Sequence, residues 1–215
     1  MSPRPISTDV LLVIDVQNDF CPGGSLAVDR GDEVVPLINR LGTEFEHVVL
    51  TQDWHPLGHI SFASSHPGRR LFETIAVPYG PQTLWPDHCL QATTGAAFHP
   101  DLDLPHAELI LRKGFRPEID SYSAFCENDR TPTGLAGYLR ERGLKRLFLV
   151  GLAYDYCVRF CALDGAELGF ECIVLEDACR AVGQTGSIES TNQAFAERGI
   201  ERLETAALLE IPRSA

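Results

Sequence analysis

Short apolar segments that alternate with helix-like segments are the feature of this sequence that most restricts its fold. The apolar segments are near-continuous runs, without the alternation of a half-exposed strand. Such runs are typical of strands buried on both faces of a parallel sheet. Five of them lie at residues 9–16, 47–51, 109–112, 146–152 and 171–175, and a weaker sixth lies at 200–203.

Helical patterns fill the intervals at residues 33–45, 133–142, 157–168 and 187–198. Gly143, Gly169 and Gly199 end three of these helices, because glycine readily adopts the left-handed conformation that closes a helix. The alternation predicts an α/β fold: a three-layer α/β/α sandwich with a mostly parallel, doubly wound sheet of about six strands. No internal repeat or linker divides the chain, so we expect one domain over residues 1–215.

One long region departs from this alternation. Residues 56–105 are rich in Pro, Gly, His and Ser and show little periodicity. A loop region of this length inside a compact domain is usually functional.

The charge of the chain restricts its partners. The 215 residues carry a formal net charge of −12, and the sequence pI is about 4.9. Such a protein repels phosphate backbones and anionic membranes, so we expect no nucleic-acid or membrane partner. A small-molecule substrate is the expected ligand, and a homo-oligomer is left open.

The cysteines and the first residues bear on the compartment. Seven cysteines form no CxxC pair and no compact disulfide framework, and the first nine residues lack the apolar run of a signal peptide. No apolar stretch approaches the length of a membrane span. These features predict reduced thiols and a cytoplasmic protein.

Reactive side chains follow four of the expected strands. Asp15 follows the first strand, Asp53 and His55 the second, Lys113 the third and Cys157 the fourth. In an open α/β sheet, ligands bind at the carboxyl ends of the strands. We therefore expect these side chains to gather at one edge of the sheet.

Cys157 is the candidate nucleophile, because it stands where a helix begins. The positive end of the helix dipole and a nearby ammonium would favour the thiolate, and free N–H groups there could hold an oxyanion. The alternative is a small buried apolar residue, which is our interpretation of Cys161. Only Lys113 and Lys145 are lysines among 18 basic residues, which favours a specific need for an ammonium at Lys113. Asp15 could take and return the Cys157 proton, or could only cap the strand end.

A candidate metal site accompanies the thiol. Asp53 and His55 project to the same side of an extended segment, and His88 offers a second imidazole. One carboxylate and two imidazoles suit a divalent ion, with Zn²⁺ favoured and Fe²⁺ or Mn²⁺ as alternatives. A hydrogen-bonded surface pair is the other interpretation of Asp53 and His55, and His59 is a further candidate ligand.

The chain resembles the isochorismatase-like cysteine hydrolases, and among them the nicotinamidases, which are also called pyrazinamidases. Five segments carry the resemblance. The first three together are its specific part, because the wider family generally lacks the metal-binding residues that they contain. The five segments are DVQNDFCPGGSLAV at 15–28, TQDWHPLGHISF at 51–62, LWPDHCLQATTGAAFHP at 84–100, KGFRPEIDSYSAF at 113–125 and VGLAYDYCVRFCALDGAELGF at 150–170.

The resemblance implies a role for each matching residue. It implies a catalytic triad of Asp15, Lys113 and Cys157, and a metal ion that binds the pyridine nitrogen of the substrate. The metal ligands would be Asp53, His55 and His88, the ring pocket would include Phe20 and Trp85, and the backbone N–H groups of Ala153 and Cys157 would form the oxyanion hole, after a cis bond between Leu152 and Ala153.

Two stretches depart from the family pattern. Tyr154 stands where the family more often has threonine, so we expect it to alter one side of the substrate pocket. The loop at residues 117–132, which contains Cys126, is given no role.

The function implied by the resemblance is hydrolysis of nicotinamide to nicotinate and ammonia through a cysteine thioester, in the recycling of nicotinamide toward NAD. Pyrazinamide is an expected second substrate. One alternative is a related cysteine amidase for a non-pyridine amide, such as an N-carbamoyl or ureido compound, and the metal block counts against it. Another is a non-catalytic binding protein of the same fold, against which the intact triad counts.

Overall fold

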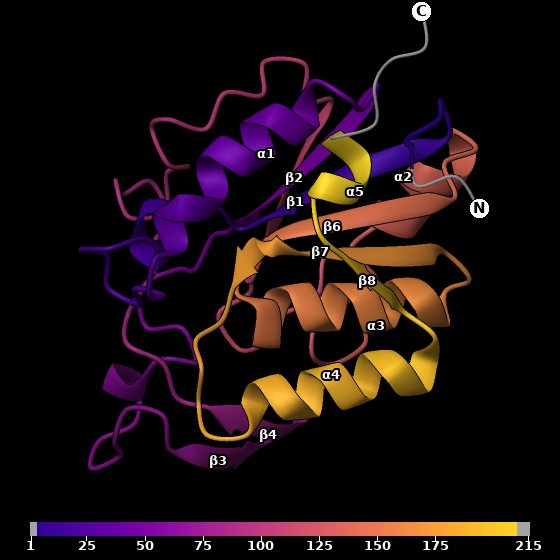
Figure 1. Cartoon of the computed structure of the whole chain (residues 1–215). Coiled ribbons are helices and arrows are strands. Elements are labelled where there is room, and N and C mark those ends of the chain that lie inside the picture. The colour runs from indigo at the N-terminus through magenta and orange to yellow at the C-terminus, as the bar shows by residue number, and fades with distance from the viewer. Residues whose placement is uncertain (1–3, 210–215) are drawn as a thin grey trace, which may run out of the picture.

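A six-stranded parallel sheet forms the centre of the computed structural model, which describes residues 4–209 (Figure 1). Its order is β5-β2-β1-β6-β7-β8. The strands are β1 (Asp9–Ile14), β2 (His47–Asp53), β5 (Leu109–Lys113), β6 (Arg146–Leu152), β7 (Glu171–Arg180) and β8 (Glu201–Leu203). Every neighbouring pair is parallel. The predicted doubly wound α/β sheet is confirmed.

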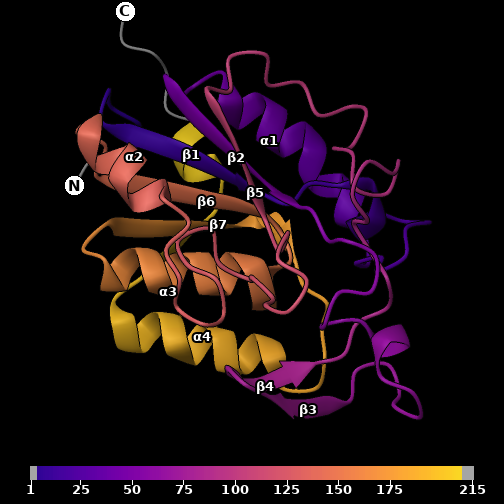
Figure 2. The same ribbon diagram turned by 180° about the vertical axis from the view of Figure 1, so that it is seen from behind.

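Helices cover both faces of the sheet, which explains the near-continuous apolar strands. In β1, Leu11 and Val13 pack into one core, while Val10, Leu12 and Ile14 pack into the other. Figures 1 and 2 show the helices of the two outer layers. The first core includes α1 (Val34–Gly42) and α5 (Ala206–Leu209), and the second α2 (Leu135–Glu141), α3 (Arg159–Glu167) and α4 (Ser187–Arg198). Within residues 4–209, no helix is long and apolar enough to cross a membrane.

Three strands run further than the sequence pattern predicted, and β5 does so by one residue, to Lys113. Strand β2 continues to Asp53, because residues 49–53 pair with β5 up to Lys113. Strand β7 continues to Arg180 after an irregularity, beyond which Gly151 of β6 pairs with Cys179. The polar residues inside this irregularity interrupt the apolar pattern and hide the continuation.

The long region at residues 56–105 contains structure that the sequence did not predict. An antiparallel hairpin joins β3 (Thr74–Val77) and β4 (Gly80–Thr83), and a 3₁₀ turn spans Ala63–Ser65. Single bridges pair His55 with Leu90 and Phe62 with Trp85. The region thereby packs against the chain that leaves β2, close to the carboxyl edge of the sheet.

Candidate active site

The carboxyl ends of β1 and β6 lie where the winding of the sheet changes direction. From β1 the chain proceeds to β2 on one side, and from β6 it proceeds to β7 on the other. A doubly wound sheet opens a crevice at this point, because the connections on either side lead away from each other. Asp15 follows β1, and the cis peptide bond between Leu152 and Ala153 follows β6.

Asp15 is fully buried and is held by the neighbouring strand. Its backbone has a left-handed φ of 49°. The Asp15 N–H donates to Thr51 Oγ1 at 3.1 Å, and the Thr51 hydroxyl donates to Asp15 Oδ1 at 2.6 Å. Thr51 therefore fixes the orientation of the carboxylate and leaves Oδ2 to face Lys113.

Lys113 joins the other candidate groups, because the register of β2 and β5 places it opposite Asp53. Its Nζ lies 2.8 Å from Asp15 Oδ2, 2.5 Å from Asp53 Oδ1 and 3.5 Å from Cys157 Sγ. It also donates to the Ser121 carbonyl at 3.1 Å. A buried ammonium needs such partners, because burial alone strongly disfavours its charge. The four strand-end groups that the sequence singled out are thus brought together.

Cys157 lies on a π-helical turn, Tyr154–Val158, that leads into α3. Burial raises the pKa of its thiol well above the usual value, and Lys113 only partly opposes this. The expected lowering of the thiol pKa by Lys113 is present, but burial outweighs it, so the net shift is upward in the substrate-free protein. The thiol stays protonated near neutral pH and needs a base.

Asp15 is placed to be that base. A carboxylate oxygen of Asp15 and the Cys157 sulfur lie within 4.8 Å of each other. Burial raises the pKa of the Asp15 carboxyl, against the lowering effect of Lys113. A raised pKa makes the carboxylate a better proton acceptor, because the base then approaches the working pH.

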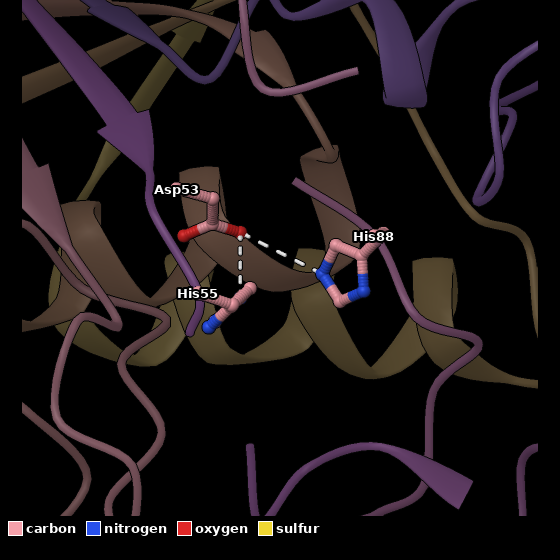
Figure 3. A group of neighbouring side chains, drawn as sticks. All are labelled: Asp53, His55 and His88. Carbon is pink, nitrogen blue, oxygen red and sulfur yellow. Dashed lines mark ion pairs between the residues drawn. The ribbon is translucent and has the colours of Figure 1, made fainter. Parts of the chain in front are cut away.

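Asp53, His55 and His88 form a site with the donor set of a divalent metal (Figure 3). Asp53 Oδ2 lies 3.6 Å from His55 Nε2 and 3.8 Å from His88 Nε2. The Nδ1 atoms are held by backbone carbonyls at 2.8 Å, that of His55 by Gly114 and that of His88 by Pro86. An N–H donated from Nδ1 leaves the Nε2 lone pair to face the carboxylate, which is how metal-binding histidines are usually oriented. The residues fit a metal ion.

The protonation states of two of these ligands suit a cation. Burial and the charge of His55 lower the pKa of His88 to about 4. Burial raises the pKa of Asp53, but Lys113, His55 and His88 together outweigh burial, so the net direction is downward. At neutral pH His88 is neutral and Asp53 is ionised, as metal ligands must be.

His59 packs against His55, one of the candidate metal ligands. Its ring centroid lies 4.3 Å from that of His55. Its Nδ1 lies 2.7 Å from Ser61 Oγ, and its Nε2 lies 3.2 Å from the Ile119 carbonyl. Both nitrogens therefore have protein partners, while His55, His59 and Asp120 also lie close enough together to hold an ion, so His59 stays a candidate ligand.

A pocket opens over the thiol and the candidate metal ligands. Ala153 and Cys157 line it, together with Asp53, His55 and His88. Phe20 and Trp85, which the resemblance placed at a ring pocket, also line it. The pocket is small, and the rings of Phe20, Trp85, Tyr122 and Tyr156 form part of its wall, which suits a flat heteroaromatic ring.

Tyr154 does not line this pocket, contrary to the expectation that it alters one side. Its hydroxyl lies 2.6 Å from Asn192 Oδ1, and its ring packs against Phe195 of α4. The π-helical turn directs Tyr154 toward the helix layer. Tyr156, two residues later, faces the pocket instead.

The loop at residues 117–132, which was given no role, supplies part of the pocket wall. Asp120 and Tyr122 line the pocket, and Tyr122 Oη accepts a hydrogen bond from Trp85 Nε1 at 3.1 Å. Asp120 and Tyr122 belong to the segment at 113–125, which carries part of the family resemblance. That resemblance could have indicated this wall, but the sequence analysis assigned a role only to Lys113.

Comparison with known proteins identifies the family. The model of the isochorismatase domain matches residues 9–201. The chain belongs to the isochorismatase family. This isochorismatase-family chain is 53% identical over 200 residues to the nicotinamidase of Acinetobacter baylyi, covering 93% of this chain and 94% of the relative. It is 45% identical over 187 residues to the nicotinamidase of Escherichia coli, covering 85% of each.

Solved structures of the isochorismatase family agree with this placement. The nicotinamidase/pyrazinamidase of Acinetobacter baumannii superposes with a TM-score of 0.93 at 52% identity, covering 94% of this chain and 99% of that one. A protein from L. infantum in complex with nicotinate gives a TM-score of 0.85 at 37% identity, covering 97% and 98%. The pyrazinamidase of Pyrococcus horikoshii in complex with zinc gives 0.75 at 35%, covering 92% and 99%.

Proposed function

We propose that this protein is a nicotinamidase, which hydrolyses nicotinamide to nicotinate and ammonia. One observation carries the proposal: the pocket over the Cys157 thiol is also lined by the three side chains that suit a metal ion. A thiol and an acid suit hydrolysis of many amides. A metal site in the same aromatic pocket adds a partner for a ring nitrogen, which selects a pyridine carboxamide.

Asp15, Lys113 and Cys157 are the proposed catalytic residues. Asp15 takes the proton of the Cys157 thiol, and the sulfur attacks the carboxamide carbon to form a tetrahedral intermediate. The backbone N–H groups of Ala153 and Cys157 are proposed to donate to its oxyanion. Asp15 then returns the proton to the departing nitrogen, so that ammonia leaves and a thioester remains.

The thioester is hydrolysed by water. Asp15 accepts a proton from this water as the oxygen attacks the thioester carbon, and the C–S bond then breaks. The proton on Asp15 passes to the sulfur, which restores the thiol, and the released nicotinic acid gives its remaining proton to solvent to become nicotinate. Lys113 stabilises the negative charge that moves between Asp15 and Cys157, since its Nζ lies 2.8 Å from the one and 3.5 Å from the other.

Asp53, His55 and His88 are the proposed metal ligands, and zinc is the proposed ion. When bound, the metal would hold the pyridine nitrogen and so orient the carboxamide. Phe20 and Trp85 would enclose the ring. Pyrazinamide has two ring nitrogens, so one of them could bind the metal in the same way. We infer that the reaction serves the recycling of nicotinamide toward NAD.

The deciding experiment measures ammonia release from matched amides by the purified protein, with metal content measured in parallel. Nicotinamide and pyrazinamide should be hydrolysed. Benzamide carries the same carboxamide without a ring nitrogen, so its kcat/KM should be lower by about 100-fold or more. Chelation should raise KM for nicotinamide steeply. A metal-free preparation with full activity, or equal rates on benzamide and nicotinamide, would contradict the proposal.

A further inference from the structure

The segment at residues 181–186, which connects β7 to α4, forms one wall of the substrate pocket. Val182 lines the pocket directly. Gln184 supports a second lining residue, because its Oε1 accepts a hydrogen bond from the Tyr156 hydroxyl at 3.2 Å. The Tyr156 ring in turn packs edge-on against Trp85 at 4.7 Å between centroids. The shape of the pocket around the substrate ring therefore depends on where this segment lies.

One buried carboxylate holds the segment. Asp155 is only 2% exposed, and it lies two residues before Cys157 in the π-helical turn. Asp155 Oδ1 accepts the Val182 N–H at 2.9 Å, and Oδ2 accepts the Gly183 N–H at 3.0 Å. The Ser187 hydroxyl, at the start of α4, donates to the same Oδ2 at 2.5 Å. Hydrogen bonds to an ionised acceptor are stronger than those between neutral groups.

The segment has the backbone composition of a hinge. Gly183 and Gly186 both adopt a positive φ, of 74° and 77°, and nothing lies within 4 Å of a Cβ placed at Gly186. Glycine takes this conformation without steric cost, so these positions can also leave it readily. A segment with two such glycines needs an outside anchor to keep a single position, and Asp155 accepts two hydrogen bonds from it and a third from Ser187, where α4 begins.

We propose that Asp155 is a positioning residue that latches residues 181–186 in place as the wall of the substrate pocket. The inference rests on the proposed function for the identity of the substrate. Asp155 acts through Val182 and Tyr156, which line the pocket and, in the proposed binding mode, would contact the ring rather than the reacting carboxamide. Contacts to a non-reacting part of the substrate contribute equally before and during the chemical step, so their loss raises KM and leaves kcat nearly unchanged.

The test is Asp155→Asn, with Asp177→Asn as the matched control. The asparagine keeps the shape of Asp155, but its NH₂ group cannot accept the hydrogen bonds that Val182, Gly183 and Ser187 donate. Asp177 likewise accepts a backbone N–H and a hydroxyl, both from Thr205, at 2.8 and 2.5 Å. Asp177 does not line the pocket, so Asp177→Asn measures what the loss of a similar set of hydrogen bonds does to activity when it occurs away from the pocket.

We expect Asp155→Asn to raise KM for nicotinamide about tenfold while kcat stays within about threefold of wild type. Asp177→Asn should change neither constant by more than about twofold. A fall in kcat with unchanged KM would overturn the proposal, because Asp155 would then act on the turn that carries Cys157. Ser187→Ala removes one of the three donors and should raise KM in the same direction but less, which keeps the test available if Asp155→Asn fails to fold.

Trypsin provides a second readout that needs no turnover. Arg180 directly precedes the segment and is half-buried. Release of the latch should speed cleavage after Arg180 by about fivefold or more in Asp155→Asn but not in Asp177→Asn, and nicotinate should slow it. Cleavage in the ligand-free protein is independent of the substrate. Equal cleavage of the two variants would refute the latch, whereas failure of the wild type to hydrolyse nicotinamide would refute the proposed function instead.

Discussion

Replacing Gly114 by alanine should weaken metal binding without replacing a proposed metal ligand. Gly114 follows β5 and has a φ of +67°. A Cβ at this position would lie 2.4 Å from His55 Cε1 and 2.7 Å from His55 Nδ1. The Gly114 carbonyl also accepts the hydrogen bond from His55 Nδ1 that orients the ring. Gly114→Ala therefore acts on the orientation of one proposed ligand.

The size of the effect follows from these distances. An ordinary van der Waals contact begins at 3.4 Å, so the His55 ring must move by about 1 Å. Metal–ligand distances in working sites vary by only about 0.2 Å, so the shift exceeds what the site tolerates. Loss of a group that orients a ligand typically weakens metal affinity about 10- to 100-fold, which corresponds to roughly 1.4–2.7 kcal/mol. The left-handed backbone adds a separate cost in folding stability of about 1–2 kcal/mol for alanine.

Gly143→Ala separates these two effects. Gly143 has nearly the same φ, +69°, but nothing lies within 4 Å of its added Cβ. Both variants should lose about 2–4 °C of Tm for each kcal/mol of backbone cost. Only Gly114→Ala should show a weaker Kd in a metal titration against a competing chelator. Equal metal affinity in the two variants would refute the assignment of His55 as a ligand oriented by Gly114.

Three further tests, with four substitutions, address the proposed catalytic groups. Cys157→Ala should abolish turnover, because it removes the attacking thiol, whereas Cys161→Ala, which replaces a fully buried cysteine that does not line the pocket, should lower Tm more than kcat. A Cys157→Ala rate of even a tenth of wild type would exclude covalent catalysis. Thr51→Val removes the hydroxyl that donates to Asp15 Oδ1. It should lower kcat about 10- to 100-fold at unchanged KM. A variant with the kcat of wild type would show that this hydrogen bond does not position the base. Lys113→Met should raise the pKa of the Cys157 thiol further, because the ammonium 3.5 Å away opposes the effect of burial. At a fixed pH below that pKa, iodoacetamide should then alkylate Cys157 in Lys113→Met at least about tenfold more slowly than in the wild type. If the alkylation rate of the variant follows the wild-type pH profile, Lys113 and Cys157 are not electrostatically coupled.

The grouping of the proposed catalytic residues could be predicted because it follows from a general property of parallel sheets. Asp15, Asp53 and Lys113 each come at the end of an apolar run, and parallel strands end at the same edge. The order of strands brings them together: β1 lies beside β2, and β2 beside β5. The alternation of strands and helices implies such an edge even before the order is known.

The pocket walls were less predictable, because they depend on the direction of individual side chains. Tyr154 and Tyr156 are both aromatic neighbours of Cys157, and only the π-helical turn decides that Tyr156 faces the pocket. Asp120, Tyr122 and Val182 come from irregular connections, where no periodicity predicts the direction of a side chain.

The sequence by itself determined the layered α/β architecture, the edge of the sheet that carries the chemistry and the residue types available there. These depend on local patterns: apolar runs, helix ends and the residues that follow each strand. The tertiary structure alone decided the protonation of the site. Burial raises the pKa of the Cys157 thiol well above its usual range, although the start of a helix and a lysine both favour the thiolate. That reversal follows from desolvation, which depends on every segment that covers the thiol, and no stretch of sequence contains that information.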